Sequence, residues 1–253
     1  FKQKTAYEIG VRLVGSEMCI RDRVWLSSLR GSDVRQLTQF KEGSNLQAYW
    51  SPDGRSLLVT GYFHGGIART YVVSATDGRA SDVAGGLAEI GSGWSRDGGM
   101  VYFVAPNLGP SRLWKVPISG ARRELVSTEH ADFAQEPVWG NSVFYCKRQD
   151  GSLWELKQGV EKKLFDGIAR RAFAVCRDGV YYVSKLAKPT LRFYRFSDKQ
   201  HVDVFRFRKT PGFGLDVSPD GLTVLFVQYD LKGDDLMIVD GFRAYTAKKI
   251  NLF

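Results

Sequence analysis

The chain has 253 residues, a formal net charge of +9, and a hydrophobic content of 43% that includes 13% aromatic residues. This content is ample for a buried core. Three cysteines exclude a disulfide-dense scaffold, although they do not fix the redox compartment. No run of 18 apolar residues is present, so the sequence predicts no membrane-spanning helix.

The first 23 residues resemble a translated sequencing-library adapter. Residues 2–9 and 13–23 back-translate in one frame to the two ends of a common adapter, and the three residues between them match the length of a sample index. We therefore expect residues 1–23 to be non-native and exclude them from the fold prediction. Five of the 36 basic and three of the 27 acidic residues lie there, which leaves a net charge of +7. The two remaining cysteines, Cys146 and Cys176, are expected to be buried free thiols.

Residues 24–38 match only the second half of a repeat that occupies the rest of the chain. Residues 24–26 align with the third strand of later repeats, and residues 33–38 align with the fourth. The sequence therefore predicts that the natural part begins inside a repeat and that the fragment is truncated at its N-terminus.

The repeat is marked by a turn of the form Trp-Ser-Pro-Asp-Gly. Its glycines are Gly54, Gly98, Gly179 and Gly221, with Gly140 near the remaining place, so the spacing is about 39 to 44 residues. Pro and Asp-Gly favour a tight turn, and the apolar runs on both sides are expected to pair as a hairpin. A period in the low forties built from short β-segments is typical of a propeller blade.

Each repeat contains four β-segments, of which the last is the most polar, as expected for an outer strand that faces water. We therefore predict an all-β fold, a β-propeller of four-stranded antiparallel blades over residues 24–243. About five to six blades are visible, four of them complete and one partial at each end. The tryptophans Trp50, Trp94 and Trp139 recur once per blade, which predicts packing between blades. Residues 244–253 are out of register and form either the last outer strand or a tail.

The turns at 50–54 and 217–221 resemble those of the WD40-like, PD40-type propellers of the TolB class. A narrower resemblance is to the ends of large acidobacterial-type proteins, in which a propeller follows a winged-helix DNA-binding domain or a serine/threonine kinase domain. It is carried by residues 113–117, 179–182, 191–196 and 236–243, although Gly241 stands where those proteins have Asn.

These resemblances imply a non-catalytic sensor or protein-interaction module, a fragment of a bacterial transcriptional regulator or kinase. The alternative is the propeller of a prolyl-oligopeptidase-type hydrolase or a TolB-like periplasmic accessory protein. The compartment, periplasmic or cytoplasmic, depends on sequence upstream of the fragment.

Motifs for catalysis were sought without success. The sequence has neither the G-x-S-x-G turn of a serine hydrolase nor a Walker A loop. His64, His130 and His201 each stand alone, without a second ligand at metal-binding spacing. The acidic segment 230–235 lacks the alternate-residue ligands of a calcium loop and is expected to be a hairpin loop. We therefore predict no enzymatic activity, no cofactor and no metal.

Four residues are candidates for binding because they lie between the second and third strands of their repeats, where propeller loops share one rim. They are Tyr62, His64, Arg112 and Lys188. We expect a protein or small ligand at this rim, although an ordinary loop role for each residue stays open.

The basic pairs are spread over different repeats. They lie at residues 122–123, 162–163, 170–171 and 206/208, in what we expect to be outer strands or connections. This scatter favours edge protection and solubility over a single basic groove, so we predict no direct nucleic-acid binding.

Overall fold

The computed structural model describes residues 23–28, 32–40, 44–63, 67–83, 90–104, 111–120, 122–147, 149–218, 220–230 and 233–239. The predictions for residues 1–22 and for the segment 244–253 lie outside these ranges. All regular secondary structure in the described residues is β-strand, which confirms the predicted all-β class.

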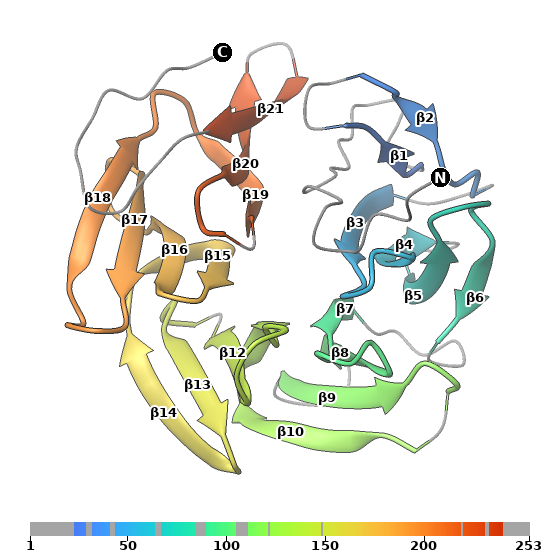
Figure 1. The fold of residues 1–253 in the computed structure, drawn as a ribbon, viewed down its shortest axis with the longest axis horizontal. Helices are drawn as coiled ribbons and strands as arrows, with labels where there is room; N and C mark the ends of the chain where they lie inside the picture. Colours follow the sequence, from blue (N-terminus) through green and yellow to red (C-terminus); the bar gives the residue numbers. More distant parts are fainter. Residues whose placement is uncertain are drawn as a thin grey trace.

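The described strands form six antiparallel sheets that follow one another around a common centre (Figure 1). Within each of the larger sheets the chain starts at the innermost strand and moves outward strand by strand. Four sheets have four strands each: β3 (Ser44–Trp50), β4 (Ser56–Phe63), β5 (Ile67–Ser74) and β6 (Ala80–Asp82); β7 (Ile90–Trp94), β8 (Met100–Val104), β9 (Arg112–Pro117) and β10 (Glu124–Glu129); β11 (Ala131–Gln135), β12 (Ser142–Lys147), β13 (Leu153–Lys157) and β14 (Val160–Phe165); and β15 (Ile168–Cys176), β16 (Gly179–Ser184), β17 (Thr190–Arg195) and β18 (His201–Arg206).

Two smaller sheets lie at the ends of the described chain. One pairs β1 (Trp25–Leu26) with β2 (Arg35–Gln36), and the other contains β19 (Pro211–Val217), β20 (Val224–Asp230) and β21 (Gly233–Val239). The β1–β2 sheet lies in the ring between the blade β3–β6 and the blade β19–β21 (Figure 1). The described residues thus form a β-propeller with four complete blades and a partial blade at each end, as the repeat predicted.

The Ser-x-Asp turn closes the inner hairpin of three blades with the same hydrogen bonds. Between β7 and β8, the Ser95 hydroxyl donates to Asp97 Oδ1 (2.6 Å), and the Met100 amide donates to the Ser95 oxygen (2.9 Å). The turns at 51–56 and 218–223 repeat both bonds at nearly the same lengths. These bonds satisfy turn amides that the sheet leaves free, which is why the sequence repeats Ser and Asp two residues apart.

The hydrophobic core is divided into clusters that lie mainly between neighbouring blades. Phe133 of β11 and Phe173 of β15 pack edge to face, with ring centroids 5.2 Å apart. The buried Trp94 at the end of β7 donates its indole N–H to the carbonyl of Tyr49 on β3 (2.9 Å). The predicted role of Trp94 in packing between blades is therefore confirmed.

The predicted strand position of Trp139 is wrong. Trp50 and Trp94 end their inner strands, whereas β11 ends at Gln135 and Trp139 lies half-buried in the bend that follows. The Gly-Asn turn of this blade is shorter, so counting back from its glycine shifts the register. At the end of β11, Gln135 contacts the next blade, because its Oε1 accepts a hydrogen bond from the Val175 amide (2.9 Å).

The inner strand of each larger blade pairs irregularly with its second strand, close to its first residues. The register shifts lie between residues 44 and 47 in β3, 91 and 93 in β7, 131 and 133 in β11, 168 and 173 in β15, and 211 and 215 in β19. Such bulges leave residues unpaired and change the direction in which their side chains point. Because all five lie at the same end of the inner strands, they surround one end of the central channel.

Candidate functional site

A cavity of about 880 Å³ lies at the end of the channel where the inner strands begin. All five larger blades contribute to its wall, mainly through the bulged starts of the inner strands and the ends of the second strands. Its volume lies in the range of sites that bind small molecules.

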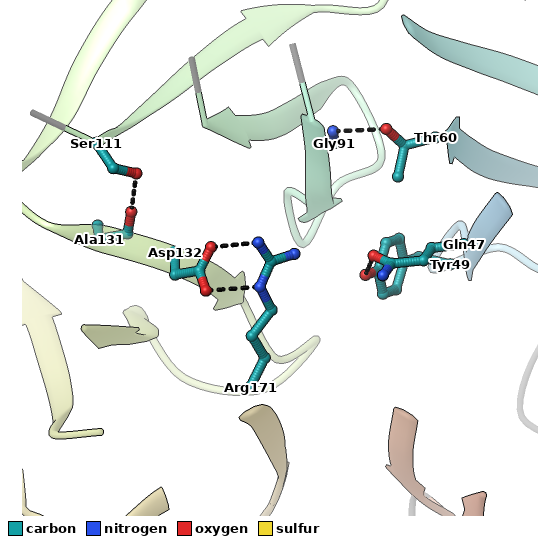
Figure 2. A network of polar contacts seen from close by, with 8 residues as sticks. All are labelled: Gln47, Tyr49, Thr60, Gly91, Ser111, Ala131, Asp132 and Arg171. Atoms are coloured by element: carbon teal, nitrogen blue, oxygen red, sulfur yellow. Dashed lines mark hydrogen bonds and ion pairs between the residues drawn. The ribbon is translucent and has the colours of Figure 1, made fainter. Parts of the chain in front are cut away.

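An ion pair joins two blades in this cavity (Figure 2). Arg171, in the bulge of β15, donates from Nε to Asp132 Oδ2 (2.6 Å), and its Nη2 lies 2.5 Å from Asp132 Oδ1. The Asp132 side chain is only 6% exposed, whereas that of Arg171 is 20% exposed. Burial acts to lower the pKa of Arg171, but the facing carboxylate outweighs it and the pKa is raised. Arg171 is therefore a permanent cation, fixed by a two-point contact.

Two side chains of β3 lie on another side of the cavity (Figure 2). Gln47 lines the wall, and the Tyr49 hydroxyl donates to Gln47 Oε1 (2.9 Å). Burial raises the pKa of Tyr49 to about 12, so its hydroxyl stays protonated and able to donate. The Tyr49 ring also lies 5.5 Å from that of Phe133 on β11. This contact links two blades that are not neighbours and narrows the centre of the ring.

The Cys146 thiol of the wall is buried, and the hydroxyl groups of Ser184 and Thr60 have structural partners. Cys146 is 2% exposed, and burial, together with the charge of Asp132, raises its pKa to about 12. Ser184 Oγ accepts a hydrogen bond from the Thr190 amide (3.1 Å), and Thr60 Oγ1 accepts one from the Gly91 amide (3.2 Å). Both cysteines are free and buried, as predicted.

The structure brings only some of the predicted rim residues together. Tyr62, 41% exposed, lines the central cavity, but it lies within β4 and not in a loop. Lys188 is exposed in the bend between β16 and β17, and its neighbour Leu186 lines the same cavity. Arg112 is the first residue of β9 and lines a different hollow, between the blades β7–β10 and β11–β14. His64 lies outside the described residues.

Sequence reasoning missed both members of the ion pair. It placed residues 170–171 with the basic pairs of outer strands and connections, which is wrong, because both belong to the inner strand β15 and Arg171 lines the cavity. Asp132 was not considered at all. The signal that would have found both is a charged residue inside an otherwise apolar first strand of a repeat.

Comparison with known proteins shows similarity at the level of the fold. No protein-family model matches the chain, and no curated protein matches it. Among solved structures, TolB from Acinetobacter baumannii superposes with a TM-score of 0.78 over 93% of this chain at 13% identity. A putative TolB from Agrobacterium tumefaciens superposes with a TM-score of 0.70 over 87% of this chain at 22% identity, and 85% of that protein is covered. The tricorn protease superposes with a TM-score of 0.68 over 91% of this chain at 14% identity.

The chain spans 62% of the length of the Acinetobacter TolB and 25% of the tricorn protease. The described residues include no helix with the length and apolar character needed to cross a membrane. The topology and these superpositions together give the chain a β-propeller fold of the TolB type.

Proposed function

We propose that this chain is a non-catalytic binding propeller, comparable to a TolB-like accessory protein, and that its ligand occupies the central cavity. The observation that carries the proposal is the convergence of five blades on one cavity of about 880 Å³, with polar side chains of three blades at its wall. A pre-formed concave site with a few polar groups is the usual form of a ligand-binding site. The likeness to two TolB structures over about nine-tenths of the chain supports the same class.

The chemistry of the wall favours binding over catalysis. A cysteine nucleophile needs its thiolate form, and the pKa of about 12 keeps Cys146 protonated at neutral pH. Asp132 is the only carboxylate among the described wall residues, and both of its oxygens are held by Arg171. General acid–base catalysis needs a proton-transferring group free to reach the substrate. We therefore propose that the cavity recognises its ligand without converting it.

We propose two kinds of larger protein to which such a binding propeller would belong. The sequence resemblance of residues 24–243 favours a sensor module of a regulator or kinase. The likeness to the tricorn protease favours the propeller of a hydrolase, in which catalysis belongs to another part of the protein. Both kinds of protein require the same binding role of the cavity, and the complete gene distinguishes them.

The test is a cavity-blocking substitution. Thr210 is exposed and lines the cavity, so Thr210→Trp places an indole at the wall, whereas Thr76→Trp adds the same group in an exposed turn elsewhere. Saturation-transfer NMR with a panel of short peptides and small organic acids should find ligands of the unaltered chain. These should lose binding by about tenfold or more in Thr210→Trp and keep it in Thr76→Trp.

Equal binding by Thr210→Trp and the unaltered chain, or no ligand in the panel, contradicts the proposed site. Turnover of a peptidase substrate that Cys146→Ala abolishes contradicts the non-catalytic role.

A further inference from the structure

Around the ion pair, the wall of the cavity offers hydrogen-bond donors, because the side-chain acceptors of Asp132 and Gln47 are already used. Asp132 accepts from Arg171 with both carboxylate oxygens, and Gln47 Oε1 accepts from the Tyr49 hydroxyl. The donors that remain on Arg171 and Gln47 are Nη1 and Nε2, neither of which has a partner within the described residues. A site whose free groups are donors selects a ligand that accepts hydrogen bonds.

The two donor groups, on Arg171 and Gln47, are placed so that both can bind the same ligand. In Figure 2 the third guanidinium nitrogen of Arg171 points away from Asp132, toward the side where Gln47 and Tyr49 lie. The two donors come from β15 and β3, which belong to different blades. A ligand atom between them would therefore connect opposite sides of the cavity.

The charge of the wall favours an anion. Lys147, Lys185 and Arg171 stand against the single carboxylate of Asp132 among the described wall residues, a net charge of +2. The Lys147 amine lies over the ring of Trp154 (4.1 Å), whereas Lys185 is exposed. Lys185 thus adds positive charge that an entering anion meets, and the permanent cation Arg171 lies deeper.

Two exposed hydrophobic side chains also line the cavity. Tyr62 is 41% exposed and Leu186 is 61% exposed, and both line the cavity. Large exposed hydrophobic side chains around a polar site provide contact area for an apolar part of a ligand. The positive charge of the wall and its exposed hydrophobic side chains together favour a ligand with an anionic group at one end and an apolar group beside it.

We infer that the cavity binds a carboxylate that carries an apolar neighbour, such as the C-terminus of a hydrophobic peptide, with Arg171 and Gln47 as its donors. The inference rests on the proposed ligand-binding function and adds the class of ligand. A planar carboxylate with two oxygens matches two N–H donors better than a single-point acceptor does.

The test compares the tripeptide Ala-Val-Phe as free acid and as C-terminal amide, with inorganic phosphate as a third probe, by NMR titration of the purified chain. The free acid should bind about tenfold more tightly than the amide, because a hydrogen bond to a charged group is stronger than one to a neutral group. Phosphate, which lacks the apolar group, should bind more weakly than the free acid. Leu186→Ser should weaken both peptides alike.

Two variants assign the donors, and a third is the control. Gln47→Glu replaces a donor by a carboxylate of the same size and should abolish the preference for the acid. The double variant Asp132→Asn/Arg171→Gln removes the cation without leaving an unpaired buried carboxylate, and it should have the same effect. Arg192→Gln removes a cation from the ion pair with Asp203 on β17–β18, outside the cavity, and should change nothing.

Each outcome separates the two proposals. Equal affinity for acid and amide, or an unchanged preference in Gln47→Glu and in the double variant, overturns the carboxylate inference and leaves the binding function intact. Phosphate binding as tight as that of the acid overturns the apolar part of the inference. Failure of both peptides to bind at millimolar concentration overturns the inference, and the Thr210→Trp experiment then decides the binding function separately.

Discussion

At the scale of single residues, the repeated Ser-x-Asp turn has an electrostatic consequence. The hydroxyl of Ser95, followed by the Gly99 amide, donates to Asp97 and lowers the pKa of that carboxyl group. The hydrogen bonds from Ser218 and from the Leu222 amide lower the pKa of Asp220 in the same way. Hydrogen bonds to the charged form are the cause, since these carboxylates lie in exposed turns.

A carboxyl group whose pKa is lower in the folded chain stabilises the fold above its unfolded pKa, which is about 3.9 for Asp. This contribution to the free energy of unfolding is lost as the pH falls from the unfolded pKa through the lower pKa of the folded chain. We therefore expect Asp97→Asn to reduce the free energy of unfolding at neutral pH and the difference from the unaltered chain to shrink below about pH 4. Urea unfolding across this range measures it. A difference that does not change with pH contradicts the electrostatic explanation.

At the scale of strands, close backbone approach fixes where two inner strands meet. A Cβ atom added to Gly93 of β7 would lie 2.5 Å from the carbonyl oxygen of Ala134 on β11. No L side chain fits at that distance without a shift of one backbone. The glycine therefore allows the blades β7–β10 and β11–β14 to pack as they do.

We expect Gly93→Ala to lower the free energy of unfolding by roughly 1–3 kcal/mol, the usual cost of overpacking. Gly99→Ala, in the turn of the same hairpin, meets only the side chain of Asp97 at 3.5 Å or more and should cost much less. Chemical unfolding of both variants gives the comparison. Equal stability of the two variants would show that the strands adjust without cost.

At the scale of the whole molecule, aromatic contacts reach across the ring. Tyr49 on β3 contacts Phe133 on β11, and Phe133 contacts Phe173 on β15, so three blades share one series of rings. Each ring interaction contributes beyond the area it buries. Neighbouring blades are thus joined at their faces, and distant blades are joined at the centre.

Phe133→Ala should therefore remove contacts with two other blades at once. We expect a loss of about 3–5 kcal/mol in the free energy of unfolding, the range for a buried Phe. Val160→Ala on the outer strand β14, 67% exposed, is the matched control and should change stability by less than about 0.5 kcal/mol. A loss at Phe133 no greater than that of the control, by thermal or urea unfolding, contradicts a central role for these rings.

Turn chemistry predicted the fold well, because Asp-Gly turns at a fixed interval specify hairpins locally. The blade order, the free thiols and the place of Trp94 followed from it. The alignment of the repeats predicted the wrong strand position for Trp139, because the turn of this blade is shorter than the others. The site was harder to predict, because Asp132 and Arg171 lie 39 residues apart and point into the cavity only through bulges, which the strand alternation of the sequence does not reveal.

The bulges at the starts of the inner strands also bear on how such a site can be changed. A residue in a bulge has no partner in the sheet ladder, so its replacement leaves the ladder hydrogen bonds in place. In three blades, the Ser-x-Asp turn that closes the hairpin lies at the opposite end of the same strand. Asp132, Arg171 and Gly212 are wall residues that lie in such bulges, so each can be exchanged while its hairpin stays closed. Because Asp132 and Arg171 form one ion pair, these two positions have to be exchanged together when the specificity of the cavity is redesigned.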